Sequence, residues 1–138
     1  LTQLTISDHN RISTTDTRLL RRLVRDNQFR AHNAEETLKI WRNVRFGEES
    51  YVFPFQEEAD IIFNTALLYE LPVLKVLAEP LLKAIPNTSP VANEAHRLLE
   101  FLSIFQPLNP AMVPSNSILR EFIGTAGHDQ CVPRTLMV

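Results

Sequence analysis

Three stretches of this 138-residue sequence place apolar residues at the spacing of an amphipathic helix, and they limit the fold more than any other feature. They cover residues 14–30, 65–85 and 91–105. Residues at i, i+3, i+4 and i+7 share one face of a helix, so each stretch can bury a face against the others. The sequence therefore predicts a mainly α fold, of the α+β kind with one or two short strands, around one hydrophobic core.

The first of these stretches contains the segment "TTDTRLLRRLVRD", residues 14–26. We expect a helix that runs to about Arg30 and places Asp16 in its first turn, where an acidic residue is favourable. A capping-box pattern at residues 33–36 predicts a second, short helix that ends near Trp41. The candidate N-caps of the first helix are Ser13, Thr14 and Thr15, and its expected apolar stripe is Leu19, Leu20, Leu23 and Val24.

The middle of the chain has a different pattern. Residues 42–58 combine aromatic, acidic, glycine and proline residues, which predicts an extended, partly buried loop. The run "ADIIFN" at 59–64 is short, apolar and rich in β-formers, which predicts a buried strand. Pro72 and Pro80 are expected to divide residues 65–85 into two or three helical pieces, because an interior proline removes a backbone hydrogen bond.

The remaining segments are assigned from their turn residues. Ser89 is expected to cap a helix with Pro90 in its first position. Residues 117–124 predict a short helix or strand, and residues 125–138 a poorly ordered tail. The chain thus divides into residues 1–64, which begin with a short extended or loop segment, a helical region at 65–124 and the tail.

The arginines of the first helix are the main candidate for chemistry. Arg18, Arg22 and Arg25 follow one another at i, i+4 and i+7, so they form one row. Guanidinium groups bind phosphate oxygens two at a time, which favours an anion site. The alternative is a solvated helix face whose arginines pair with Asp16 and Asp26, and the spacing leaves both open. Arg21 lies beside the row, while Arg11 and Arg30 flank the helix.

Charge is concentrated in the same region. Residues 11–45 hold nine basic and four acidic residues, a formal charge of +5, whereas the remainder holds five and twelve, a formal charge of −7. This distribution indicates one localised anion site and argues against a general nucleic-acid-binding surface. No run of 18 apolar residues and no signal pattern is present, so we expect a cytoplasmic protein without a membrane segment.

Other catalytic arrangements are not indicated. The four histidines lack metal-ligand spacing, so no zinc site is expected, and the single Cys131 cannot form an intrachain disulfide. The pairs Glu48–Glu49 and Glu57–Glu58 read as solvated charges. Only three glycines occur and GxxxxGK[ST] is absent, so a P-loop for nucleotide phosphates would have to lie outside this chain. The histidines are His9, His32, His96 and His128.

The arginine segment and the stretch that follows it resemble the lid and next strand of the uridine kinase and phosphoribulokinase family of P-loop kinases. That family shows D-x-R-L-x-R-R-x-x-R-D, then a basic residue, acidic residues, a proline and an Ala-Asp pair. The segments "FNTALLYELPVLKVLAEPLL", "EAHRLLEFLSIF" and "SNSILREFIG" are similar to the C-terminal third of long bacterial nucleoside kinases, so the resemblance covers about residues 5–124. The matching positions are Asp16, Arg18, Leu19, Arg21, Arg22, Arg25, Asp26, Arg45, Glu48, Glu49, Pro54, Ala59 and Asp60.

The resemblance implies phosphoryl transfer from ATP, with Mg²⁺, to the 5′-hydroxyl of a pyrimidine nucleoside. Residues 1–64 would hold the lid helices and the next strand, and residues 65–124 the C-terminal helices. The Walker lysine, the metal-binding Ser/Thr and the catalytic Asp precede the lid in that family. This chain would therefore hold no catalytic residue and no metal ligand, and would be inactive alone.

By position, the resemblance assigns two groups of residues to ligands. Arg22, Arg18 and His32 fall on the nucleoside side, although His32 and Ile40 stand where shorter uridine kinases have arginine and glutamine. Leu68 or its neighbours stand where those kinases have a base-side Asp, so the nucleoside stays open. The strand at 59–64 would be covered by a helix or paired with another copy of the chain. The residues on the side of the ATP phosphates are Arg25, Arg30 and Arg21.

A second hypothesis needs no kinase. The same arginine row could dock an acidic partner or a nucleic acid as part of a helical interaction module. The two hypotheses differ in salt dependence, because affinity for nucleic acid falls steeply as salt rises. The kinase hypothesis alone accounts for the companion pattern at residues 54–60.

Overall fold

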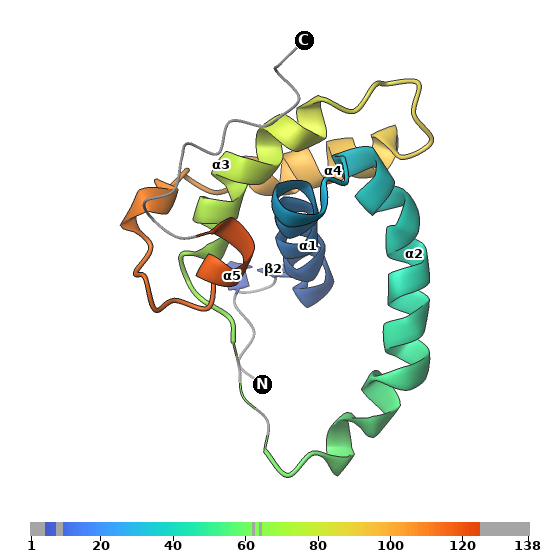
Figure 1. Cartoon of the computed structure of the whole chain (residues 1–138), viewed down its shortest axis with the longest axis vertical. Coiled ribbons are helices and arrows are strands. Elements are labelled where there is room, and N and C mark those ends of the chain that lie inside the picture. The colour runs from blue at the N-terminus through green and yellow to red at the C-terminus, as the bar shows by residue number, and fades with distance from the viewer. Residues whose placement is uncertain (1–4, 8–9, 62, 64, 125–138) are drawn as a thin grey trace.

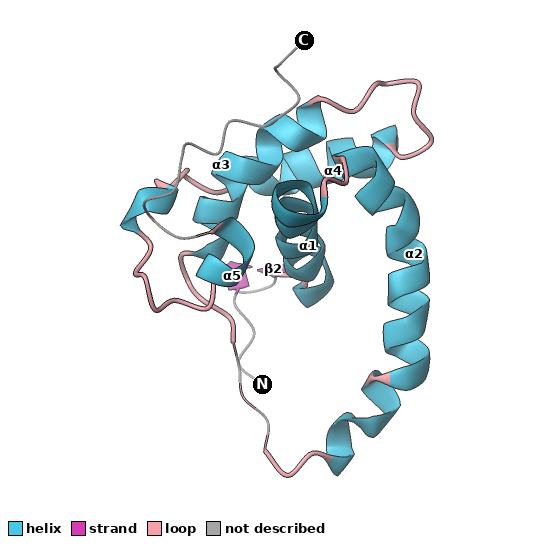
Figure 2. Ribbon diagram, viewed as in Figure 1, coloured by secondary structure: helices cyan, strands magenta, loops and turns pink. Residues whose placement is uncertain are grey.

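The computed structural model describes residues 5–7, 10–61, 63 and 65–124, and this part of the chain is mainly helical, as predicted (Figure 2). The tail expected at 125–138 lies outside the described residues. A short antiparallel hairpin at the N-terminus pairs β1 (Thr5–Ser7) with β2 (Asn10–Arg11). The helices are α1 (Thr14–Arg30), α2 (Ala34–Tyr51), α3 (Glu70–Lys83), α4 (Ala92–Ser103) and α5 (Arg120–Ile123), with the 3₁₀ turns η1 (Phe53–Glu58) and η2 (Pro110–Met112).

Helix α1 lies at the centre of the fold, with α3, α4 and α5 around it (Figure 1). Ser13 is its N-cap, since the backbone N–H of Asp16 donates to the Ser13 hydroxyl at 3.3 Å. The helix ends at Ala31, which adopts the left-handed conformation with φ 55°. The predicted stripe is confirmed, because the side chains of Leu19, Leu20, Leu23 and Val24 are all buried.

The prediction for the second helix was wrong in its length. The capping box is present, with Asn33 Oδ1 accepting from Glu36 N at 2.8 Å and Glu36 Oε2 accepting from Asn33 N at 3.0 Å. The helix does not end near Trp41 but continues to Tyr51, and η1 follows where an extended loop was expected. Gly47 was taken as a helix breaker, yet one glycine costs a helix only about 1 kcal/mol, and its neighbours are mostly good helix formers.

The strand predicted at "ADIIFN" was also wrong for the residues described there, 59–61 and 63, which are not in a strand. Their side chains are exposed, including Ile61 at 86% and Phe63 at 82%. A strand needs a neighbour for its backbone hydrogen bonds, and no strand of the described chain pairs with this segment. No described helix covers Ile61 or Phe63.

The C-terminal helices differ from expectation in two places. Helix α3 is one piece and not two or three, because Pro72 lies in the first turn, where its missing N–H has no intrahelical partner, and the helix tolerates Pro80 near its end. Helix α4 begins at Ala92, two residues after the expected start. Ser89 caps a turn instead, since its hydroxyl accepts from the backbone N–H of Val91 at 3.3 Å. Residues 120–123 form a helix, one of the two expected alternatives.

One hydrophobic core joins the N-terminal and C-terminal parts of the chain. Its buried side chains come from α1, α3, α4 and α5, from the first turns of α2, and from the loop before α5. Leu98 and Leu102 of α4 point inward as predicted, with Leu99 and Phe105 partly buried beside them. In the part of the chain that the structure describes, no helix combines the length and apolarity required to cross a bilayer.

Two polar anchors fix the ends of α1 and α2 against this core. The guanidinium of Arg97 in α4 donates to both carboxylate oxygens of Asp16, at 2.7 and 3.0 Å. Hydrogen bonds with Glu94 and Asp16 raise the pKa of the Arg97 guanidinium. Hydrogen bonds from Lys39 and Ser89 lower the pKa of the Glu35 carboxyl. These contacts hold the first turn of α2 against the α3–α4 connection, and farther along the helix Arg45 donates to the Thr15 hydroxyl of α1 at 3.0 Å (Figure 1).

Candidate anion-binding site

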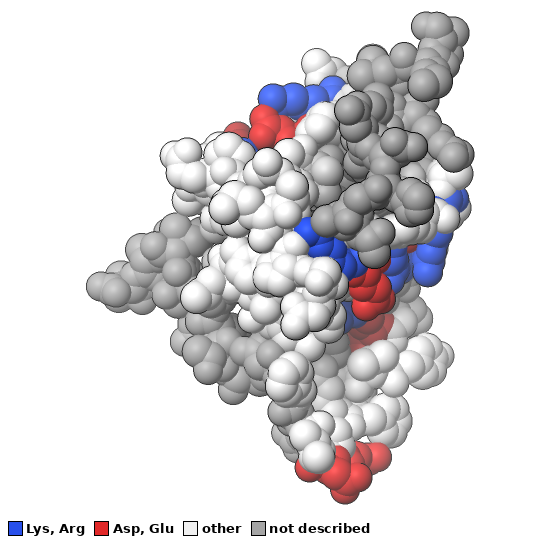
Figure 3. All heavy atoms as spheres, turned by 60° about the vertical axis from the view of Figure 1, so that its left-hand side comes forward, with Lys and Arg blue, Asp and Glu red and all other residues white. Residues whose placement is uncertain are grey.

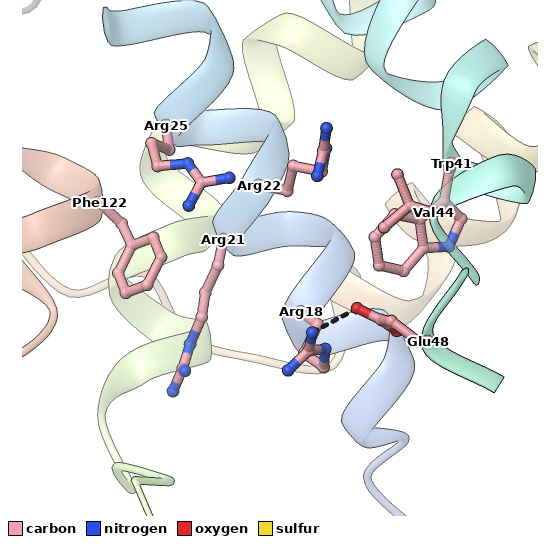
Figure 4. Close-up of a pocket in the computed structure, with 8 residues that line it drawn as sticks. All are labelled: Arg18, Arg21, Arg22, Arg25, Trp41, Val44, Glu48 and Phe122. Atoms are coloured by element: carbon pink, nitrogen blue, oxygen red, sulfur yellow. Dashed lines mark hydrogen bonds and ion pairs between the residues drawn. The ribbon is translucent and has the colours of Figure 1, made fainter. Parts of the chain in front are cut away.

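The arginine row lines an open pocket of about 180 Å³ between α1, α2 and α5 (Figure 4). Its floor is α1, one wall is the inner face of α2, and the opposite wall is Phe122 of α5. Four of the arginines proposed from the sequence therefore meet in one site. The lining residues are Arg18, Arg21, Arg22, Arg25, Trp41, Val44, Glu48 and Phe122.

Asp26 lies behind the row and is fully buried. Its carboxylate oxygens are 3.1 Å from Arg22 Nε, 3.5 Å from Arg25 Nε and 3.3 Å from a terminal nitrogen of Arg30. Three guanidinium groups thus share one carboxylate, which fixes their positions and compensates its burial. The pairing of Asp26 with arginines of its own helix is confirmed, and it contacts three of them.

The contacts with Asp26 leave hydrogen-bonding capacity unused. The buried Nε atoms of Arg22 and Arg25 and both oxygens of Asp26 make no well-directed hydrogen bond with any described residue. The charges are close enough to attract one another, but the N–H directions are not satisfied. Because a buried donor without a well-directed partner is unfavourable, the guanidinium groups of Arg22 and Arg25 would gain from an oxyanion in the pocket, whereas the Asp26 oxygens would not.

Glu48 occupies the α2 side of the pocket and pairs with Arg18 (Figure 4). Arg18 is the most exposed of the four arginines in the pocket, with 56% of its side chain accessible. Glu48 is buried, so its prediction as a solvated charge was wrong, and its Oε2 has no hydrogen-bond partner among the described residues. Glu48 is therefore an internal anion that holds Arg18 in the place where an external anion would bind.

Arg21 is the most enclosed member of the row. It makes a two-pronged ion pair with Glu70 at the start of α3, with one contact at 2.6 Å, and donates to the carbonyl of Thr65 at 3.3 Å. The Phe122 ring lies 5.3 Å from the Arg21 guanidinium carbon, within the range of a cation–π contact. With these partners Arg21 joins α1 to α3 and α5, so its main contribution is to the fold of the site.

The pocket keeps a positive charge after these pairings. Five arginines (Arg18, Arg21, Arg22, Arg25, Arg30) face three carboxylates (Asp26, Glu48, Glu70), a formal excess of two positive charges. Trp41 and Val44 form an apolar wall beside them, which lowers the local dielectric and strengthens attraction to an anion. The arrangement suits a small multivalent anion.

The other two residues that the sequence assigned to the site, Arg30 and His32, do not line the pocket. Arg30 belongs to the site through Asp26 and does not line the pocket. His32 is exposed in the link between α1 and α2, outside the pocket. Among the described residues, no group of three or more histidine, cysteine, aspartate and glutamate side chains could hold a metal ion.

Four lining residues were not anticipated as parts of a site. Trp41, Val44 and Glu48 follow one another at i, i+3 and i+7, a spacing that would have placed them on one face had the helix been extended past Trp41. Phe122 has no such signal, because it reaches the pocket only through the packing of α5 on α1.

A scan against protein-family models, a search of curated proteins and a search of solved structures each found no match to this chain.

Removing the internal anion is expected to raise affinity for an external one. Glu48→Gln keeps the size and polarity of the side chain but releases the positive charge of Arg18 into the pocket. Loss of one competing charge at this partly screened site should increase affinity for tripolyphosphate by roughly 3- to 10-fold. Calorimetric titration measures the change, and Glu94→Gln, a surface substitution on α4, is the matched control. Equal affinities for the Glu48 variant and the parent would contradict this role.

Proposed function

We propose that this chain is the lid-bearing, C-terminal part of an ATP-dependent nucleoside kinase similar to uridine kinases. In this proposal the arginine pocket binds ATP phosphates and the transferred phosphoryl group, next to a nucleoside 5′-hydroxyl. The observation that carries it is the convergence of four arginines of α1 on one open pocket, two of them with buried Nε atoms that lack hydrogen-bond partners. Phosphoryl transfer spreads negative charge over several oxygens, which such a cluster can stabilise.

Residues 59–63 support the idea that a further part of the enzyme is needed. Ile61 and Phe63 are two positions apart and both are largely exposed. A continuous apolar run of this kind is typical of a strand buried on both faces of a parallel sheet. A sheet-bearing part with the P-loop would supply such neighbours, together with the Mg²⁺ site and the catalytic base that the resemblance places there. The complete enzyme would act in the cytoplasm, where ATP and nucleosides meet.

The division of roles within the row follows from the contacts. Arg18, Arg22 and Arg25 line the pocket, where their guanidinium groups can donate to phosphate oxygens. Arg21 is held by Glu70 and keeps the helices together. Arg30 acts from behind, through Asp26. A guanidinium that an internal carboxylate already holds in position loses less side-chain freedom when a ligand binds.

The experiment is a calorimetric titration of the 138-residue chain with ATP, tripolyphosphate and duplex DNA at two salt concentrations. We expect saturable binding of ATP and tripolyphosphate, reduced at least fivefold by Arg18→Ala and unchanged by Lys83→Ala, whose lysine pairs with Glu79 on the surface. A small ligand neutralised by two or three groups should lose much less affinity with salt than a nucleic acid does. Tighter binding of DNA than of ATP, with a steep salt dependence, would favour the interaction-module hypothesis instead.

A further inference from the structure

The wall that α2 contributes to the arginine pocket differs in chemistry from the floor that α1 contributes. The floor consists of arginines, whereas the wall presents an indole ring, an aliphatic side chain and a carboxylate, from Trp41, Val44 and Glu48 (Figure 4). These three residues lie on successive turns of one face of α2, at i, i+3 and i+7. An inorganic anion would use the floor alone, so the wall indicates a ligand with a second part that is not anionic. Elsewhere on the surface, Figure 3 shows Lys and Arg side chains beside Asp and Glu.

Trp41 offers the pocket an aromatic ring that has no partner of its own. The side chain is half-buried, since it packs against the core on one side and lines the pocket on the other. Phe122 and Phe53 each have an arginine over their ring, at 5.3 and 5.9 Å. Among the residues that the structure describes, neither a cation nor a second ring packs on Trp41 in this way. A nucleobase is a flat group that stacks on such a ring.

Glu48 offers a hydrogen-bond acceptor that has no donor. Only 10% of its side chain is accessible, and one carboxylate oxygen pairs with Arg18. The other oxygen, Oε2, is buried and has no hydrogen-bond partner in the described chain. A buried acceptor without a donor is unfavourable, and a phosphate ion, which brings three more acceptor oxygens, does not relieve it. A ring N–H or an amino group of a nucleobase does.

The size of the pocket limits what part of a nucleotide it holds. Its volume of about 180 Å³ is below the about 300–1,000 Å³ of pockets that enclose a drug-sized ligand. It has room for a phosphate group and one ring close together. In ATP, two phosphates and a ribose separate the transferred phosphoryl group from adenine, whereas ribose alone separates it from the base of the acceptor nucleoside. The acceptor's base is therefore the one that fits beside the arginines.

The spacing along α2 suits a single ring. Val44 and Glu48 are four residues apart, which corresponds to about 6 Å along the helix axis. A ring that packs on Trp41 and Val44 thus has its edge at Glu48, while the sugar and phosphate extend towards the arginines of α1.

We propose that the α2 wall is the platform for the base of the acceptor nucleoside, which stacks on Trp41 and donates a ring N–H to Glu48 Oε2. The 5′-end of the nucleoside then lies against Arg22 and Arg25. The proposal rests on the proposed function for its anion site, and it adds the residues that select a ligand with a base. Glu48 has two roles in it, because one oxygen holds Arg18 and the other contacts the base.

Three ligands with the same phosphate test the platform on the unmodified 138-residue chain. Uridine 5′-monophosphate has a base with one ring N–H, its N3-methyl derivative lacks that N–H, and ribose 5-phosphate lacks the base. By calorimetry we expect uridine 5′-monophosphate to bind at least about fivefold more tightly than ribose 5-phosphate, and the methylated ligand to lose several-fold. Trp41 is the only tryptophan of the chain, so its fluorescence should respond to the two ligands with a base and much less to ribose 5-phosphate.

Two variants assign these preferences to residues. In Trp41→Leu the wall stays apolar but loses its ring, so the affinity ratio of uridine 5′-monophosphate to ribose 5-phosphate should fall towards one. In Glu48→Ala the ratio of uridine 5′-monophosphate to its methylated derivative should fall towards one. Ratios between two ligands on one variant cancel general changes in stability or charge. Phe46→Leu is the matched control, because Phe46 is an exposed aromatic residue of α2 that does not line the pocket.

The possible failures are distinguishable. Equal binding of uridine 5′-monophosphate and ribose 5-phosphate, or an unchanged ratio in Trp41→Leu, would overturn the platform and leave the anion site in place. Equal binding of the methylated and unmethylated nucleotides would overturn the contact with Glu48. If tripolyphosphate and uridine 5′-monophosphate both failed to bind, the anion site and the proposed function would be contradicted together with the platform.

Discussion

Asp26→Ala is expected to lower the free energy of unfolding by about 3–5 kcal/mol. Asp26 is fully buried, and its carboxylate is the shared counter-ion of Arg22, Arg25 and Arg30. Its removal leaves three guanidinium groups close together without the charge that balances them. Urea unfolding followed by circular dichroism measures the loss.

Asp16→Ala is the matched control on the same helix. Asp16 also pairs with an arginine, but its partner Arg97 is about half exposed, so the pair is worth roughly 1 kcal/mol or less. The two variants remove the same chemical group at opposite ends of α1. If Asp26→Ala lowered stability no more than Asp16→Ala does, Asp26 would not be the organiser of the arginine cluster.

Arg22→Ala together with Arg25→Ala is expected to reduce turnover by at least about 10³-fold in a protein that contains both this chain and a P-loop. Loss of one group that stabilises transition-state charge is worth roughly 3 kcal/mol, and both arginines line the pocket. Steady-state transfer of phosphate from ATP to uridine measures the effect. The KM for uridine should change less than kcat, because the stabilised charge develops in the transition state.

A second double variant separates chemistry from stability. Alanine at both positions leaves Asp26 with Arg30 as its remaining partner, so part of any loss could come from the fold. Arg22→Lys with Arg25→Lys keeps two positive charges beside Asp26 but removes the forked donors that grip phosphate. Its thermal midpoint should stay near that of the parent while turnover still falls about 10²-fold. Full turnover in the lysine variant would mean that point charge is sufficient and that guanidinium geometry is not used.

The sequence predicted the parts of the fold that depend on local pattern. Two features of α1 depend only on residues a few positions apart and could be predicted. They are the buried apolar stripe of Leu19, Leu20, Leu23 and Val24, and the N-cap, for which Ser13 was one of the candidates. The row of arginines was visible for the same reason, since side chains four apart on a helix are neighbours wherever the helix lies.

The errors arose where tertiary context overrides local signals. Gly47 and the aromatic run after it were interpreted as a loop, but good helix formers on either side carry α2 past the glycine to Tyr51. The apolar segment at 59–64 has the composition of a strand, and composition cannot supply the partner that a strand requires. Glu48 of α2 and Phe122 of α5 line the pocket, and Glu70 of α3 pairs with Arg21, so only the packed structure shows that the arginines already hold internal partners.

A phosphorus NMR titration of ATP with the 138-residue chain tests directly whether the arginine pocket binds ATP phosphates. We expect saturable shifts of the β- and γ-phosphate resonances, smaller shifts for the α-phosphate, and loss of saturation in Arg18→Ala combined with Arg22→Ala. Lys83→Ala should behave as the parent does. Unchanged β- and γ-resonances at millimolar chain concentration, or shifts that persist in the double arginine variant, would contradict it.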